Sequence, residues 1–218
     1  MEKPRVYNLL ILDESGSMES IKTPIISGFN EIVQTIGNAG KEFPGQEHFV
    51  SFVTFNTGGI KTILDAVPAA YLQPVNEHNY RPNSGTPLYD AIGFSVNNLK
   101  QRMNGSTSGK VLVTILTDGL ENSSREYSGE NIKKMIENLK DKGWTFTYIG
   151  TDHDVYESSG NISIDNFYVF DKSSESAGAM FVKEKSARTK FYSLVSSDPD
   201  SLNKGYRYFK NKEDSDKN

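Results

Sequence analysis

The chain has 218 residues and a formal net charge of -4 at pH 7, with 24 basic and 28 acidic side chains. This length suits one domain, or one domain with a short appendage, and it is sufficient to bury a three-layer core. The absence of cysteine excludes disulfides, cysteine-based zinc sites and thiol chemistry. Charges of both signs are interspersed, so no basic stripe indicates a nucleic-acid partner and no basic amphipathic helix indicates a membrane surface.

The apolar segments are short. The N-terminal stretch MEKPRV contains no long apolar segment of the kind found in signal peptides. The apolar run VYNLLIL that follows is far shorter than the roughly 20 residues of a membrane span. We therefore expect no signal peptide, no membrane association and a cytoplasmic location.

The first half of the chain predicts a strand, a helix and a hairpin. Residues 5–12 are continuously apolar, which is typical of a strand buried on both faces. Residues 18–38 carry Ile, Val and Phe at helical spacing, and the pattern stops near Gly37 and Gly40. Residues 48–56 and 60–67 flank the sequence TGG and predict the two arms of a β-hairpin, which a polar loop over residues 68–85 follows.

The second half alternates between helix and strand. We expect helices over residues 86–103, 129–143 and 175–195, and strands over residues 110–119, 144–152 and 166–173. Strands that alternate with helices predict an α/β fold with a doubly wound, mostly parallel six-stranded sheet and helices on both faces. The hairpin adds one antiparallel strand, most simply at an edge. Ligands bind such sheets beyond the carboxyl ends of the strands, where the strand order reverses.

Three oxygen-rich segments stand out. LLILDESGSMESI places Asp13, Ser15 and Ser17 at alternate positions, NSGTPLYDAI carries Thr86 at the start of a helix, and ILTDGLENSS carries Asp118 at the end of a strand. Each has an ordinary interpretation alone, because Ser and Thr are common helix N-caps and Asp-Gly is a common turn.

Together the three segments favour a cation site. The strands ending at Asp13 and Asp118 are expected to flank the reversal point, so that the two carboxylates lie side by side. Adjacent carboxylates repel each other unless a cation lies between them. Carboxylates and hydroxyls are hard oxygen ligands, suited to Mg²⁺ and also to Mn²⁺ or Ca²⁺.

The pattern Asp13-x-Ser15-x-Ser17, with the later Thr86 and Asp118, resembles the metal-ion-dependent adhesion site of von Willebrand factor A (VWA) domains. LDESGSM, GTPLYDAI and LTDGLENSSREY resemble small bacterial and phage-associated members in particular. The resemblance implies a Rossmann-like sheet in the order 3-2-1-4-5-6 with an antiparallel third strand. We expect the VWA domain to span residues 1–195, with a C-terminal extension over residues 196–218 that ends in the charged, disordered tail KNKEDSDKN.

The resemblance also implies a mechanism. Ser15 and Ser17 would bind the metal directly, and Thr86 and Asp118 would bind it directly or through water. One coordination position would stay open for an Asp or Glu of a protein partner, so the chain is expected to be an interaction module and not an enzyme. Some relatives couple metal ligation to a movement of the last helix, which corresponds here to the helix over residues 181–195.

Two other functions remain as alternatives. A magnesium-dependent phosphoryl-transfer or hydrolytic enzyme could use Asp13 as its nucleophile. The usual haloacid-dehalogenase pattern would have Asp where Ser15 stands, and the chain has neither a GxxxxGKS/T loop nor a GxSxG elbow. The second alternative is a structural subunit whose metal only holds loops together.

Nearby acidic residues have simpler interpretations. Glu14, Glu19 and Glu121 are interpreted as solvated charges beside the site. Asp90 lies one turn after Thr86 and is interpreted as favouring the helix dipole.

Overall fold

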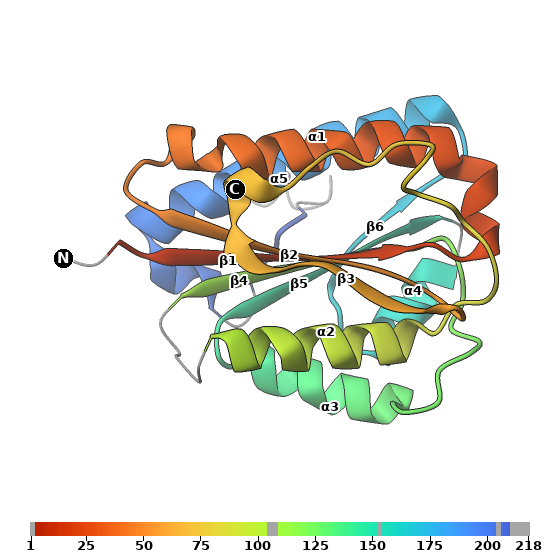
Figure 1. Cartoon of the computed structure of the whole chain (residues 1–218). Helices are drawn as coiled ribbons and strands as arrows, with labels where there is room; N and C mark the ends of the chain where they lie inside the picture. Colours follow the sequence, from red (N-terminus) through yellow and green to blue (C-terminus); the bar gives the residue numbers. More distant parts are fainter. Residues whose placement is uncertain (1–2, 104–108, 152–153, 204–205, 210–218) are drawn as a thin grey trace, which may run out of the picture.

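The computed structural model describes residues 3–103, 109–151, 154–203 and 206–209, which form a six-stranded sheet between two layers of helices (Figure 1). The strands are β1 (Arg5–Asp13), β2 (Glu47–Asn56), β3 (Gly59–Pro68), β4 (Lys110–Leu116), β5 (Trp144–Thr151) and β6 (Asn166–Phe170). The α-helices are α1 (Lys22–Glu42), α2 (Leu88–Arg102), α3 (Gly129–Lys140), α4 (Asp154–Asn161) and α5 (Ser174–Ser197). Three short 3-10 helices are η1 (Gly16–Ile21), η2 (Ala69–Tyr71) and η3 (Pro199–Leu202).

The sheet has the predicted topology. Its strand order is β3-β2-β1-β4-β5-β6, and all neighbouring strands are parallel except β2 and β3. The hairpin therefore contributes the antiparallel edge strand, as expected from the TGG turn. The doubly wound α/β fold predicted from the sequence is confirmed.

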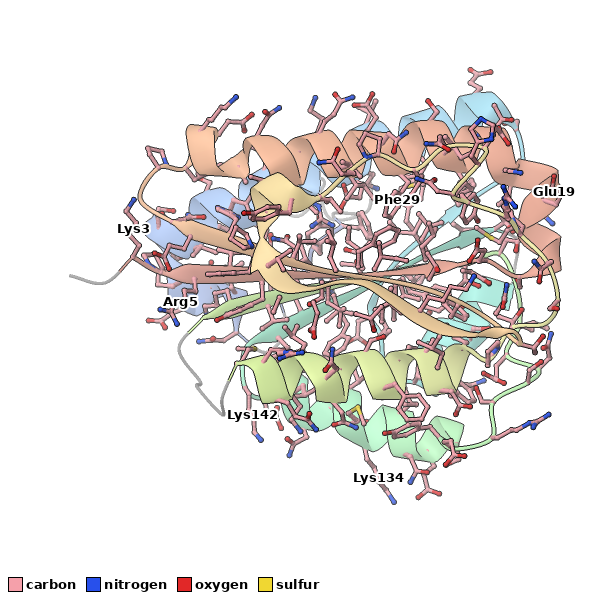
Figure 2. All side chains as sticks on the ribbon, viewed as in Figure 1. Lys3, Arg5, Glu19, Phe29, Lys134 and Lys142 are labelled. Carbon is pink, nitrogen blue, oxygen red and sulfur yellow. The ribbon has the colours of Figure 1, made fainter. Side chains whose placement is uncertain are left out.

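The alternation of side chains along β1 explains the two core layers. Leu10 and Leu12 pack in the cluster that α1 and α5 cover, whereas Leu9 and Ile11 pack in the cluster that α2 and α3 cover. Figure 2 shows Phe29 of α1 directed toward the sheet, where its ring lies 5.0 Å from that of Phe52 on β2. Both faces of the strand are buried, which is why its sequence is continuously apolar.

The first helix differs from the prediction at both ends. The chain enters it through η1, and α1 continues through Gly37 and Gly40 to Glu42. Both glycines are exposed, and a β-carbon at either would meet no atom within 4 Å. The helix ends at Glu42, because the next residue, Phe43, precedes Pro44, and a proline ring disfavours the helical conformation of the residue before it.

The packed structure continues beyond residue 195, where the sequence analysis sets the end of the VWA domain. Leu202, Tyr208 and Phe209 are buried in the same core cluster as α1 and α5. The tail over residues 210–218 lies outside the described residues. None of the described helices combines the length and the hydropathy needed to cross a lipid bilayer.

Candidate metal centre

The candidate site lies where the order of the sheet reverses. β1 pairs with β2 on one side and with β4 on the other, and the helices that follow β1 and β4 cover opposite faces. The loops that leave β1 and β4 therefore meet at one edge of the sheet, on the right in Figure 1. Glu19, labelled in Figure 2, lies at this edge.

Asp13 is held in a fixed orientation at the end of β1. Its side chain is fully buried. The backbone N–H of Ser15 donates a hydrogen bond of 2.7 Å to Oδ1, and the hydroxyl of Thr117 donates one of 2.6 Å to Oδ2. Burial raises the pKa of Asp13 to about 6, although both hydrogen bonds favour the ionised form, and the charge of Asp118 adds a smaller increase. A cation at this position would favour the carboxylate over the acid.

A chain of hydroxyls links the two loops. The Oγ atoms of Ser15 and Ser17 lie 3.1 Å apart, and the Ser17 hydroxyl donates a hydrogen bond of 2.6 Å to Asp118 Oδ1. Ser17 and Asp118 are 101 residues apart in the sequence, so only the fold brings them together.

Thr86 reaches the same place from the loop before α2. Its side chain is buried, and its backbone N–H donates a hydrogen bond of 2.9 Å to Asn122 Oδ1. A β-carbon built on Gly119 would lie 3.0 Å from Thr86 Oγ1 and 3.3 Å from Ser17 Oγ. Both hydroxyls therefore lie against Gly119, which directly follows Asp118, and any side chain at Gly119 would intrude between them.

Helix capping does not account for the hydroxyls of Ser15 and Thr86. Ser15 occupies the N-cap position of η1, but its side chain makes no capping hydrogen bond. The N-cap of α2 is Pro87, so Thr86 lies one position before the cap. The interpretation of Ser15 and Thr86 as helix N-caps is therefore wrong for both side chains.

The donor set fits a hard divalent cation. The side chain of Asp118 is completely buried, and its Oδ2 has no hydrogen-bond partner among the described residues. The ammonium of Lys172 lies 3.6 Å from this oxygen, within ion-pair range but too far for a hydrogen bond. The described part of the chain contains no metal-binding cluster of three or more His, Cys, Asp or Glu residues. The candidate set instead combines two carboxylates with three hydroxyls, which are oxygen ligands of the type that Mg²⁺, Mn²⁺ and Ca²⁺ accept.

Comparison with known families agrees with the topology. A model of the von Willebrand factor type A domain family matches residues 9–186. The chain belongs to the VWA family. VWA domains commonly mediate protein–protein interactions. No curated protein matches the sequence significantly.

Several solved structures resemble this VWA domain. A point variant of the PilB minor pilin from Streptococcus sanguinis has a TM-score of 0.59 and 14% identity, with 90% of this chain and 64% of the pilin chain covered. The vWF domain of the type V pili tip protein Mfa5 from Porphyromonas gingivalis has a TM-score of 0.57 and 11% identity, covering 84% and 95%. The pilus adhesin SpaC from Lactobacillus rhamnosus GG has a TM-score of 0.58 and 16% identity, covering 85% and 30%. At these identities the similarity shows the fold, and the chain spans less than two-thirds of the pilin and adhesin chains.

The VWA site contains residues that the sequence analysis missed. The last parallel pair between β1 and β4 is Leu12 with Leu116, so Asp13 lies beside Thr117 and Asp118 comes one residue later. The sequence analysis expected Asp118 beside Asp13, whereas Thr117 occupies this position and Asp118 is offset by one residue. The hydroxyl of Tyr80 also donates a hydrogen bond of 2.7 Å to the carbonyl of Asp13.

Three acidic residues hold backbone groups near the site: Glu14 and Glu121 are not the solvated charges expected, and Asp90 has a role in addition to its expected place in the first turn of α2. Glu14 is buried and accepts a hydrogen bond of 2.8 Å from the backbone N–H of Arg81. Glu121 accepts hydrogen bonds from the backbone N–H groups of residues 89, 123 and 124. Asp90 accepts hydrogen bonds from the backbone N–H groups of residues 125, 126 and 127. These carboxylates fix the loops around the VWA site, whereas Glu19 is exposed as expected.

A polar cavity of about 540 Å³ opens beside Thr86. Asn122, which holds the backbone of Thr86, contributes to its wall. The remaining lining residues are Asn56, Thr57, Gly59, Ile60, Pro87, Asp90, Ser123, Ser124 and Arg125. The VWA domain therefore has room beside the candidate ligands for polar side chains of another molecule.

Proposed function

We propose that this VWA domain binds a protein partner through a divalent cation held by five residues, Asp13, Ser15, Ser17, Thr86 and Asp118. The observation that carries the proposal is the buried Asp118 carboxylate, whose Oδ2 lacks a hydrogen-bond partner among the described residues while its Oδ1 ends the hydroxyl chain. A buried carboxylate oxygen without a partner is costly unless a cation or donor compensates it. Mg²⁺ is the first candidate, and Mn²⁺ and Ca²⁺ are the others.

The protein residues would have distinct roles. Thr117 and the Ser15 backbone N–H hold the Asp13 carboxylate in one orientation. The hydroxyls of Ser15, Ser17 and Thr86 would supply neutral ligands and so leave most of the cation's charge uncompensated. When bound, the cation would supply a positive charge that a carboxylate from outside can complete. We propose that an Asp or Glu of the partner fills this position, with its neighbouring residues over the polar cavity.

The geometry of Asp13 favours a binding role over an enzymatic one. A nucleophilic carboxylate must be reached by the substrate it attacks, yet the Asp13 side chain is fully buried. The lone pairs left after its two hydrogen bonds could still meet a small ion or its bound water. We therefore propose that the domain is not an enzyme. The second alternative, a structural metal without a partner, is separated by the experiment below.

The cellular location is also part of the proposal. We propose a small VWA protein of the bacterial or phage-associated type in the cytoplasm, with neither nucleic acid nor membrane as partner. The absence of cysteine is consistent with a reducing compartment. The three similar structures come from a minor pilin, a pili tip protein and a pilus adhesin. Cell fractionation should therefore distinguish a cytoplasmic location from one on the cell surface.

Metal titration tests the first half of the proposal. A cation that binds only the folded state raises the free energy of unfolding by about 2.7 kcal/mol at a hundredfold excess over its dissociation constant. We expect Mg²⁺ to raise the melting temperature of the wild-type protein and to give a calorimetric binding isotherm. Thr86→Val has nearly the same shape without the hydroxyl and should weaken binding, whereas Thr86→Ser keeps the hydroxyl and should retain it. The absence of a shift with Mg²⁺, Mn²⁺ and Ca²⁺ would refute the site.

Partner capture tests the second half. Immobilised protein is incubated with host lysate in Mg²⁺ or in EDTA, with Thr86→Val as the matched control. We expect a protein that is retained in Mg²⁺ and lost in EDTA and on the variant. If the protein binds the metal but retains its partner equally in Mg²⁺ and in EDTA, the metal would have a purely structural role.

A further inference from the structure

We propose that Lys172 is a tethered cation that competes with the divalent metal for Asp118 and thereby sets the metal affinity of the site. This inference rests on the proposed function, because it concerns the same carboxylate. The observation behind it is the pair between Lys172 Nζ and Asp118 Oδ2 at 3.6 Å. The same oxygen has no hydrogen-bond partner among the described residues.

Lys172 approaches the site from across the sheet. Asp118 follows β4, Lys172 follows β6, and β5 lies between these two strands. The backbone beside Lys172 is fixed, because Ser173 N–H donates a hydrogen bond of 2.8 Å to Asp171 Oδ1 and Asp171 N–H donates one of 3.0 Å to Ser176 Oγ. Ser173 also caps α5. The Lys172 ammonium therefore extends from the fixed backbone just before α5 toward the Asp118 carboxylate, which follows β4.

The two partners differ in their contact with solvent. The Asp118 side chain is 0% exposed, whereas that of Lys172 is 43% exposed. The carboxylate therefore cannot gain solvation by moving slightly, but the lysine can turn its ammonium into water. A lysine side chain is well suited to this exchange, because it is a compact charge on a flexible stem of four carbons.

One ammonium cannot replace a divalent cation at this site. It brings a single charge and donates hydrogen bonds, whereas the five proposed oxygen ligands would accept a small ion of higher charge. The two cations also repel each other at such short range. Loading the site with metal therefore requires Lys172 to leave Asp118 Oδ2, and the lost ion pair lowers the apparent affinity for the metal.

The charge of Lys172 is tested by substitution. Lys172→Met keeps most of the aliphatic stem and removes the charge, while Lys172→Arg keeps the charge. Lys190→Met is the matched control, because Lys190 is exposed and lies sixteen residues into α5, about 24 Å along the helix. Calorimetric titration with Mg²⁺ at fixed ionic strength gives the dissociation constant of each protein, and circular dichroism checks the fold.

We expect Lys172→Met to bind Mg²⁺ about fivefold more tightly than the wild type, the upper end of what an ion pair with a solvent-exposed partner contributes. Lys172→Arg and Lys190→Met should stay within about twofold of the wild type by the same scale. Equal or weaker binding by Lys172→Met, while the wild type binds Mg²⁺, would overturn this inference and leave the metal site intact. If the wild type binds no divalent cation, the proposed function and this inference fail together.

Discussion

At the scale of single residues, the orientation of Asp13 depends on a hydroxyl that the sequence did not single out. Thr117 donates a hydrogen bond of 2.6 Å to Asp13 Oδ2. Groups that hold a metal ligand by hydrogen bonding fix its orientation, and their loss typically lowers metal affinity about 10- to 100-fold. Thr117 is therefore a positioning residue for the proposed site.

Thr117→Val tests this role. The variant keeps the shape of the side chain and removes the donor, so we expect Mg²⁺ affinity to fall by about tenfold or more. Thr117→Ser retains the hydroxyl and should rescue most of the affinity. Calorimetric titration of the three proteins measures the effect, and equal affinities would show that burial and the Ser15 N–H orient Asp13 without Thr117.

The five candidate ligands could be proposed from the sequence because they stand in short patterns, and they stay a prediction. Asp13, Ser15 and Ser17 lie within five residues, and Thr86 and Asp118 stand beside helix and strand boundaries. The supporting residues were harder to predict, because Glu14, Glu121 and Asp90 act on backbone N–H groups of other loops. Only tertiary structure decides whether such a carboxylate meets those groups or water.

At the scale of elements, α1 and α5 approach each other at a glycine. A β-carbon on Gly28 would overlap the ring of Phe181 in α5. Glycine normally weakens a helix, by about 1 kcal/mol relative to alanine. Its presence at Gly28 is explained by this close packing, whereas Gly37 in the same helix has no neighbour that requires it.

Gly28→Ala and Gly37→Ala should therefore have opposite effects. We expect Gly28→Ala to lower the free energy of unfolding by about 1–3 kcal/mol through overpacking. Gly37→Ala should raise it by up to about 1 kcal/mol through helix propensity. Urea denaturation measures both variants, and Phe181→Leu combined with Gly28→Ala should recover part of the loss. A stabilising Gly28→Ala would contradict the close approach.

The boundaries of the elements were less predictable than their order. The alternation of strands and helices and the hairpin identified all six strands, because hydrophobic periodicity is a strong local signal. The continuation of α1 past its glycines was not predicted, because an exposed glycine weakens a helix without ending it. The burial of Phe209 after η3 depends on a core that residues far earlier in the sequence build.

At the scale of the whole molecule, stability should depend on pH through His48. This side chain is buried, and neither ring nitrogen has a hydrogen-bond partner among the described residues. Its ring lies 4.6 Å from that of Tyr192 in α5. Burial lowers the pKa of His48 to about 4, compared with 6.5 for an ordinary histidine.

The sign of the effect follows from the lowered pKa. Above pH 6.5 His48 is neutral in both the folded and unfolded states. Between pH 6.5 and about 4 the unfolded state takes up a proton and the folded state does not, so stability falls as the pH falls. The total loss is about 3 kcal/mol, and it is complete below about pH 4.

His48→Phe should remove this component while it keeps the ring against Tyr192. We expect the difference in the free energy of unfolding between His48→Phe and the wild type to shift by about 3 kcal/mol in favour of the variant from pH 7 to pH 4. His78 is exposed in a loop, so His78→Gln should show no such shift. Urea denaturation at several pH values measures the difference, and parallel curves for His48→Phe and wild type would contradict the prediction.

A fully buried arginine joins α5 to the sheet. Arg188 pairs with Glu184 of the same helix at 2.6 Å and donates hydrogen bonds to Asn8 Oδ1 of β1 and Thr114 Oγ1 of β4. The Tyr208 hydroxyl, beyond the helix, donates a hydrogen bond of 2.9 Å to Glu184 Oε1. Arginine in this place thus contacts two strands and its own helix at once.

The contacts of Arg188 limit how far α5 can move when a partner binds at the proposed metal site. Sliding α5 by one turn would displace Arg188 by about 5.4 Å and separate it from both strands. The Arg188–Glu184 pair would move with the helix, but the two hydrogen bonds from Arg188 to the strands would be lost. Each hydrogen bond to a charged group contributes about 1.5–3 kcal/mol, whereas coupling between distant sites typically amounts to about 1–3 kcal/mol. Partner binding would thus leave the register of α5 unchanged. The domain would bind its partner as a rigid body, without transmitting a helix movement to the opposite end of the sheet.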